Sequence, residues 1–560
     1  MSYDLPPGPP PTDPPGSGPE TLDSRGGARL TSSTGPAPVR GRRTAVIAVV
    51  GALGVVAVGG AAWAAWSFLS TGAQPAEALP AKTIAYASVD LDPSGGQKIE
   101  ALRTLKKFPA FEDQVGLDTD DDVREWIFDQ IQDESGCADL DYDDDIAPWL
   151  GDRFAVAAVD TGGDTPTPVF VVQVSDADAA DQGLGKLREC AGGSDNVAWH
   201  IDGDWALLGE DQKTVDGIAD DAADSSLADD DDYQQWTDAA GDSGIVSMYA
   251  APAAGKVLAD NLGGLGGLAL GSSALACPAP CSGVSLTDGE TAPDEVTDAL
   301  KDFKGAAATI RFDDGGLELE LAADPAATGQ AVTGGDDGAE AVSALPDDTA
   351  AAIGLSFEKG WLTDLVDQFA KASGESSDDL LAEAGEQLGI ELPGDVETLV
   401  GESLTLAVDG DFDPSSITGL PGVDGNAGPS GIGVKVIGEA DDIEGVLDKL
   451  RASAGGADGG VLDSDSDGDV VAIGPDADYR KVLLENGGLG DSDPFKTVVE
   501  HADDAAAILY VNFAAGDHWL AELAGDDAEV RDNLKPLEAL GMSAWVDDDT
   551  AHAVLKITTD

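Results

Sequence analysis

This chain reads Trp149-Leu150-Gly151-Asp152-Arg153-Phe154-Ala155-Val156 at one point and Leu399-Val400-Gly401-Glu402-Ser403-Leu404-Thr405-Leu406 at another. In both stretches, an apolar pair and a glycine precede an acidic residue and a run with the alternation of a β-strand. Landmarks around the two stretches recur in the same order. The pairs are Leu79–Ser88 with Leu345–Gly354, Pro168–Val174 with Gly433–Ile437, and Ile201–Trp205 with Ser466–Val470. We interpret this order as an internal duplication.

Each copy combines strand-like and helix-like segments. Residues 197–201 and 204–209 are predicted strands joined by an Asp-Gly turn, which is hairpin spacing rather than the spacing of a strand–helix–strand unit. The sequence therefore predicts an α+β fold with two tandem lobes, residues 78–324 and 344–560, each with a mainly antiparallel sheet. Linkers are expected at residues 70–77 and 325–343. The alternative is two unrelated α/β segments that resemble each other by chance.

Charge and apolar content exclude two classes of protein. The chain of 560 residues has 107 acidic and 30 basic side chains, which give a formal net charge of −77. Apolar residues make up 42% of the chain. The apolar share is large enough for a core, which excludes wholesale disorder. The negative charge repels phosphates, which excludes nucleic acid as a partner. The same acidity fits either solubility in high salt or divalent cations that bridge the chain to an anionic cell wall.

The first 69 residues differ in composition from the rest. Residues 1–43 are rich in Pro, Gly, Ser and Thr, so we expect a disordered tail. Residues 44–69 contain no charged side chain, and as a helix they extend about 39 Å, enough to cross a hydrocarbon core of about 30 Å. Arg40, Arg42 and Arg43 precede this segment, which places the N-terminus in the cytoplasm.

The sequence thus predicts a single-pass plasma-membrane protein whose remaining residues form an ectodomain outside the cell. The alternative is a cleaved signal peptide, for which Ala76-Glu77-Ala78 offers a cleavage site. A secretory signal has a shorter apolar core than residues 44–69, which favours the membrane span.

Four cysteines lie in the first lobe, and they are Cys137, Cys190, Cys277 and Cys281. An even number in an oxidising compartment predicts disulfides, although four cysteines allow three pairings. One pairing closes the local loop from Cys277 to Cys281 and leaves Cys137 with Cys190. A metal or thiol-redox site is the alternative, but no histidine lies near and the spacing is not Cys-x-x-Cys.

No segment matches a catalytic or cofactor-binding motif, so we predict neither catalytic residues nor a cofactor. Gly241–Gly244 resembles the nucleophile segment of chymotrypsin-type proteases, but Ile245 stands where that pattern has glycine. The chain has four histidines, which are His200, His501, His518 and His552. None of them lies in a motif typical of a catalytic general base, and none is spaced from another as metal ligands are.

The residues Asp463, Asp465 and Asp467 resemble the opening of a calcium loop. An EF-hand needs glutamate at the position where Gly474 stands, and the first copy has a simple hairpin turn at this place. We therefore treat the three aspartates as weak metal candidates and expect a solvated turn instead.

A basic segment follows the predicted span in an otherwise acidic ectodomain. Residues 92–109 contain a Gly-rich turn and then a predicted helix, with the basic residues Lys98, Arg103, Lys106 and Lys107. The second copy lacks this cluster. These side chains could pair internally with aspartates, or they could contact lipid headgroups or an acidic partner near the membrane. We predict an anion or membrane contact at this segment.

The same region carries a family resemblance. Leu79-Pro80, Ala85-Tyr86, the stretch Asp90–Ile99 and Lys107-Phe108-Pro109 follow the predicted span. In these motifs the chain resembles an actinobacterial family of single-pass membrane proteins that is defined only as a domain of unknown function (family 3352). The resemblance implies placement outside the cytoplasm and implies no catalytic residue.

Three functions fit these features. The first is a non-catalytic, membrane-anchored binding protein of the cell envelope, whose partner is another protein or a wall component. The second is a carrier of an apolar ligand or lipid between the lobes, suggested by the Gly/Leu segment Leu262–Leu268. The third is a hydrolase without a recognisable motif. The missing motifs favour the first hypothesis.

Overall fold

The computed structural model describes residues 74–91, 96–116, 122–135, 140–163, 165–190, 197–261, 300–313, 315–325, 337–373, 376–412, 431–454, 460–516, 518–524, 527–547 and 549–560. The predicted tail 1–43, the predicted span 44–69 and the Gly/Leu segment 262–268 lie outside these ranges. Within the described ranges, no helix is both long enough and apolar enough to cross a bilayer.

Alternating burial identifies the strands, because successive side chains of a strand point to opposite faces of a sheet. In β2 (Leu150–Val159) every second residue is buried. The other strands before residue 324 are β1 (Thr83–Asp90), β3 (Thr167–Val174), β4 (Ala198–Asp202), β5 (Trp205–Gly209), β6 (Val246–Ala250), β7 (Ala306–Asp313) and β8 (Gly316–Ala323). Those after residue 344 are β9 (Ala351–Ser356), β10 (Ser403–Val408), β11 (Ile432–Ile437), β12 (Ser464–Asp467), β13 (Val470–Ile473), β14 (Ala507–Asn512), β15 (Leu537–Asp547) and β16 (Thr550–Thr559).

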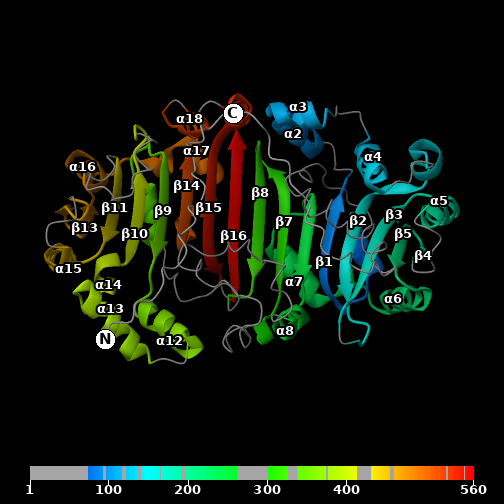
Figure 1. Ribbon diagram of the computed structural model, residues 1–560, viewed down its shortest axis with the longest axis horizontal. Helices are drawn as coiled ribbons and strands as arrows, with labels where there is room; N and C mark the ends of the chain where they lie inside the picture. Colours follow the sequence, from blue (N-terminus) through cyan, green and yellow to red (C-terminus); the bar gives the residue numbers. More distant parts are fainter. Residues whose placement is uncertain are drawn as a thin grey trace, which may run out of the picture. The chain divides into compact units, whose positions relative to one another are not determined.

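These strands pair antiparallel throughout and form one 16-stranded sheet (Figure 1). Outward from the central β8–β16 pair, the first half has the order β8-β7-β6-β1-β2-β3-β5-β4, and the second half has the order β16-β15-β14-β9-β10-β11-β13-β12. Each strand of the first half thus has a counterpart eight strands later in the chain.

The predicted mixture of helices and mainly antiparallel strands is confirmed. The sequence-based prediction placed a separate sheet in each lobe, whereas β8 and β16 join the strands of both halves into one sheet. A strand at the edge of a sheet exposes unpaired backbone N–H and C=O groups. Pairing β8 with β16 removes one such edge from each half.

Glycine closes the hairpin turns at corresponding places. The turn between β4 and β5 contains Gly203, with φ of 56°, and the turn between β12 and β13 contains Gly468, with φ of 61°. Only glycine adopts this left-handed conformation without a steric penalty from a Cβ atom. The Asp-Gly dipeptides that predicted these hairpins therefore lie at the positions that require glycine.

Helices cover both faces of the sheet. They are α2 (Gly96–Leu105), α3 (Pro109–Gln114), α4 (Val123–Ser135), α5 (Ala177–Cys190), α6 (Gln212–Asp224), α7 (Asp231–Ala239), α8 (Pro252–Asn261), α11 (Asp337–Ser343), α12 (Trp361–Ser373), α13 (Ser377–Leu388), α14 (Gly394–Val400), α15 (Ala440–Ala454), α16 (Ala477–Leu484), α17 (Asp493–Val498), α18 (Trp519–Leu523) and α19 (Ala528–Leu534). Ile218 of α6 and Trp236 of α7 pack against the first half of the sheet, as Leu483 of α16 and Phe495 of α17 pack against the second. We call the sheet face under these four helices the core face.

The opposite face of the first half is covered near β7 by other helices. Leu102 of α2 and Phe111 of α3 pack with Phe312 of β7, and the half-buried Leu317 of β8 borders the same cluster. Leu317 and Leu319 point to the same side of β8, since side chains two residues apart share a face. This opposite face therefore lies under α2 and α3.

A buried ionic cluster lies on the core face where the two halves meet. Lys556 of β16 lies directly opposite Glu318 of β8, which in turn lies opposite Arg311 of β7. The Nζ atom of Lys556 lies 2.7 Å from Asp313 Oδ2, 3.1 Å from Glu318 Oε2 and 2.9 Å from Glu500 Oε1. Arg311 also pairs with Glu318. Because Lys556 is 2% exposed and Glu318 is 1% exposed, water cannot replace these partners.

Burial and ion pairing act in opposite directions on the lysine. Burial lowers the pKa of Lys556, but hydrogen bonds to Asp313, Glu500 and Glu318 outweigh it and raise that pKa above its ordinary value. Burial raises the pKa of Glu318 despite the nearby Arg311 and Lys556. The charged ammonium therefore occupies the space between three carboxylates, whose oxygens lie within 4.8 Å of one another.

We expect Lys556→Met to lower the free energy of unfolding by about 3–5 kcal/mol, because it leaves buried carboxylates without a counter-charge. The double variant Lys556→Met/Glu318→Gln should recover part of this loss, since a neutral amide replaces the unpaired carboxylate. Urea unfolding of the purified full-length protein measures both effects. Lys481→Met, at an exposed lysine, is the control. A single variant as stable as the native protein would contradict the prediction.

Candidate anion-binding site

The basic segment of the first half reaches the second half of the sheet. Lys107 follows α2, and its Nζ atom donates hydrogen bonds to the backbone oxygen and to Oγ1 of Thr559, both at 2.9 Å. Thr559 is the last residue of β16. Arg103 and Lys106 are exposed on the same segment, and the side chain of Lys98 lies outside the described part. Of the four predicted basic residues, Lys107 is therefore the one that the fold brings to a site.

A cavity of about 600 Å³ opens beside Lys107. It is lined by Lys107, His518, Ala521, Arg531, Lys535, Pro536 and Asp560. The lining combines the segment between α2 and α3 with α18, α19 and the residues that follow α19. Figure 1 shows α3 and α18 near the end of β16, where these segments meet.

A hydrogen bond holds the two sides of this region together. The backbone N–H of Ala110 in α3 donates to Oδ1 of Asn533 in α19 at 2.9 Å. The backbone N–H of Asp560 donates to the oxygen of Pro536 at 3.1 Å, which fixes the end of β16 next to the start of β15. The cavity is thus built on backbone that both halves position.

The charge of the lining is opposite to the charge of the chain. Three of its seven residues, Lys107, Arg531 and Lys535, carry positive charge at neutral pH, and Asp560 is the acidic residue among the seven. Lys535 also forms an ion pair with Asp532, in which Nζ lies 2.8 Å from Oδ1. The side chain of Lys535 is 56% exposed. In a chain with a net charge of −77, this concentration of cations favours a bound anion.

The described lining residues suit the binding of an anion. The cations supply N–H donors, which suit phosphate or carboxylate oxygens. What this arrangement can do is hold an anion in place.

The serine of the protease-like segment lies elsewhere. Ser243 lines a second cavity of about 30 Å³ together with Arg153 and Asp90, and no histidine is among its lining residues. Arg153 is 3% exposed, and its Nε atom donates to Oδ2 of Asp90 at 2.8 Å. This small polar cavity therefore surrounds a buried ion pair that links β1 to β2.

The three weak metal candidates lie around β12. Asp465 and Asp467 belong to this strand, and Asp465 Oδ2 accepts a hydrogen bond from Nε of Arg480 at 2.9 Å. In the described part of the chain, three other carboxylates lie close enough together to share an ion, and they belong to Asp313, Glu318 and Glu500. These three carboxylates surround the ammonium group of Lys556. The expectation for the three candidates was a solvated turn, whereas the structure has a strand, β12, that runs into the hairpin turn at Gly468.

Of the four cysteines, Cys190 lies within the described residues, at the end of α5, and it is disulfide-bonded. Cys137, Cys277 and Cys281 lie outside the described residues. The pairing therefore stays a prediction.

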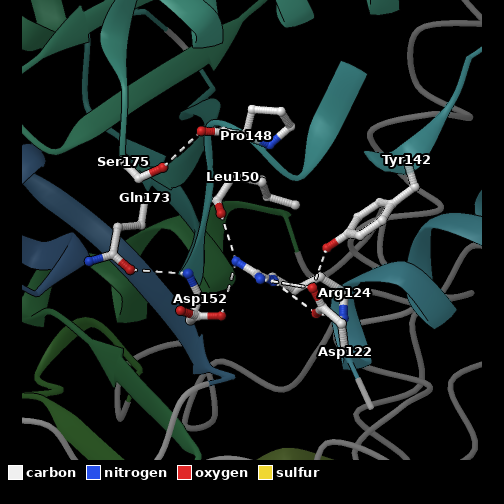
Figure 2. Close-up of polar contacts among 8 residues, drawn as sticks. All are labelled: Asp122, Arg124, Tyr142, Pro148, Leu150, Asp152, Gln173 and Ser175. Atoms are coloured by element: carbon white, nitrogen blue, oxygen red, sulfur yellow. Dashed lines mark hydrogen bonds and ion pairs between the residues drawn. The ribbon is translucent and has the colours of Figure 1, made fainter. Parts of the chain in front are cut away.

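A second polar cluster ties α4 to the sheet (Figure 2). Arg124 donates to Oδ1 and Oδ2 of Asp122, and its Nη1 atom donates to the backbone oxygen of Leu150 at 2.7 Å. The hydroxyl of Tyr142 donates to Asp122 Oδ2 at 2.7 Å. Because its partners are saturated by contacts within the chain, this cluster stabilises the fold and offers no free site.

The pKa of Asp122 reflects these contacts. Burial opposes its ionisation, but hydrogen bonds from Arg124 and Tyr142 outweigh burial and hold the pKa of Asp122 below its ordinary value. Burial and the hydrogen bond to Asp122 raise the pKa of Tyr142 well above its ordinary range.

Sequence reasoning missed the half of the cavity that α18 and α19 supply. Arg531 and Lys535 are four residues apart, a spacing that places two side chains on one helical face. Two bases at this spacing in so acidic a chain were the available signal. Nothing in the sequence connected them to Lys107.

The comparisons with known proteins match one family model to part of the chain and indicate no activity. The family described as "Protein of unknown function (DUF3352)" matches residues 45–199, which is less than half of the chain and confirms the resemblance to a domain of unknown function. No curated protein matches the chain. A solved structure titled "Structure of crystal form III of TP0453" aligns with 46% of this chain and 81% of that chain, at 7% identity and a TM-score of 0.21, which is too weak to support an argument.

The Asp122 cluster gives a pH-dependent prediction. Asp122→Asn should lower stability at pH 7, because the amide loses the ion pair with Arg124. A group with a lowered pKa contributes stability above its ordinary pKa, here 3.8, and loses it as the pH falls through the lowered value. The difference between the two proteins should therefore persist at pH 5 and shrink only below about pH 3.8.

Urea unfolding followed by tryptophan fluorescence at low protein concentration measures this difference, because the sequence pI is about 4.1 and concentrated protein precipitates near it. Asp129→Asn, at an exposed position of the same helix, is the control. A difference that is already lost at pH 5 would show that the pKa of Asp122 is not lowered.

Proposed function

We propose that this protein is a non-catalytic, membrane-anchored binding protein outside the cytoplasm, and that it binds an anionic ligand in the cavity beside Lys107. The observation that carries this proposal is the reversal of charge at the cavity. Lys107, Arg531 and Lys535 converge there in a chain with a net charge of −77. Acidic surfaces repel anions, so a free anion is attracted to this place rather than to the molecule as a whole.

The proposed anchor rests on the sequence. Residues 44–69 have the length and composition of a membrane span, and the arginines before them favour a cytoplasmic N-terminus. Residues 92–109, which carry Lys107, begin fewer than thirty residues after the proposed span, and this short separation supports a position of the cavity near the membrane surface or the inner part of the cell wall. An anionic lipid or a wall component is therefore available to the site.

The proposed two-lobed origin has support in the strand order. The same order of eight strands occurs twice, which fits a duplicated unit with boundaries near 78–324 and 344–560. The cavity combines Lys107 of the first unit with Arg531 and Lys535 of the second. A ligand bound there contacts both units, as the hypothesis of a ligand between the lobes requires.

Binding of inorganic phosphate to the purified full-length protein tests the site. We expect saturable binding by calorimetry at low ionic strength, and we expect Lys107→Met and Lys535→Met each to weaken it about tenfold, since a hydrogen bond to a charged group contributes about 1.5–3 kcal/mol. Lys481→Met is the matched control, because Lys481 is similarly exposed and also pairs with an aspartate three residues away. Equal effects of all three substitutions would refute a specific site.

The proposed location has its own test. Protease added to intact cells should digest the residues from 74 onward, whereas residues 1–43 should be cut only after the membrane is permeabilised. An epitope tag at each end of the chain reports the two events on a blot. Protection of the C-terminal tag in intact cells would contradict placement outside the cytoplasm.

A further inference from the structure

A continuous row of large apolar side chains crosses the centre of the sheet on the face opposite the core face. Each member lies directly opposite the next across neighbouring strands. From β8 to β10, the row consists of Leu319, Leu555, Met542, Leu509, Ile353 and Leu406. We call it the apolar row. With strands about 4.8 Å apart, it is about 24 Å long.

The apolar row is not part of the core. Ile353 is 39% exposed and Leu406 is 37% exposed, and the other four side chains are half-buried. None of the six belongs to the hydrophobic clusters that the described residues form. Their neighbours that point to the core face, such as Ala352 and Tyr510, are buried under helices. A row of this length on central strands marks a binding surface.

The row and the cavity lie on the same face of β16. Side chains two residues apart share a face, so Leu555 and Thr559 point to the same side of the strand. Thr559 Oγ1 accepts the hydrogen bond from Lys107, which lines the cavity. Four residues of strand separate Leu555 from Thr559, which is about 13 Å. The cationic cavity thus lies at one end of β16, the strand that carries Leu555, the second member of the row from β8.

We propose that the apolar row binds the acyl chain of an anionic lipid whose headgroup occupies the cavity. This proposal rests on the proposed function and names its ligand class. The charge of the cavity complements a phosphate headgroup, and the row supplies an apolar surface for the chain at the distance that one molecule spans. A wholly apolar ligand would make no use of the positive charge of Lys107, Arg531 and Lys535. A free anion without a chain would leave the row exposed to water.

The assignment predicts how affinity depends on chain length. A buried methylene contributes about 0.8 kcal/mol, so each added methylene should tighten binding about two- to fourfold while the chain lies along the row. The probes are glycerol 3-phosphate and lysophosphatidic acids of increasing acyl length, each used below its critical micelle concentration. Binding to the purified full-length protein is measured by calorimetry.

Two substitutions test the row itself. Ile353→Asn and Leu406→Asn change exposed side chains and should leave the melting temperature nearly unchanged, yet both should reduce the dependence on chain length by at least half. Val482→Asn is the matched control, because Val482 is 42% exposed and lies on α16, away from the row. Lys107→Met should weaken every probe about equally, since it acts on the headgroup.

The outcomes separate this inference from the proposed function. If glycerol 3-phosphate binds through Lys107 but the acyl chain adds no affinity, the cavity binds anions and the row has another occupant. If no probe binds, both proposals are wrong. If the row substitutions instead dissociate a dimer in analytical ultracentrifugation, the row is a contact between copies of this chain and the lipid assignment is overturned.

Discussion

The pairing of β8 with β16 is the constraint on which the structure depends, because it joins sixteen strands into one sheet. Backbone hydrogen bonds alone do not set its register, since a shift by two residues would preserve the pattern of faces. The buried charges do set it. Lys556 lies opposite Glu318, and a shift of β16 would separate this buried lysine from Glu318 and Asp313, which costs several kcal/mol although Glu318 would keep Arg311. The cluster thus contributes specificity as much as stability.

Much of this fold could be predicted from local sequence. Strand alternation and the Asp-Gly turns at Gly203 and Gly468 depend on neighbouring residues, and they were identified correctly. The single sheet could not be predicted, because Arg311, Glu318 and Lys556 look like ordinary outward-facing charges of three separate strands. Their burial follows only when β8 meets β16. Interactions between residues more than 200 positions apart leave no periodic signal in the sequence.

The candidate site likewise has one part that the sequence predicted and another part that it did not. The basic segment around Lys107 was visible because its composition contrasts with an acidic chain. Arg531 and Lys535 were overlooked, since two bases on a short helix are unremarkable until the fold brings them beside Lys107. Lys98, Arg103 and Lys106 were predicted together with Lys107, and composition alone could not rank them. The hydrogen bonds of Lys107 to Thr559 distinguish it.

Within the duplication, the basic segment that carries Lys107 occurs in the first copy and not in the second. Figure 1 shows α12 and α8 near the opposite end of the central strands from α2 and α18, which are their counterparts in the repeated order. The stretch near Glu358, Lys359 and Gly360 corresponds to the basic segment 92–109, and it lacks the basic cluster of that segment. The apolar row runs through the junction and is shared by both halves. For the proposed lipid, a cation cluster at one end of a sheet with repeated strand order favours one orientation, with the charged headgroup beside Lys107. Divergence of one short segment is thus sufficient to distinguish two ends that the duplication would otherwise leave equivalent.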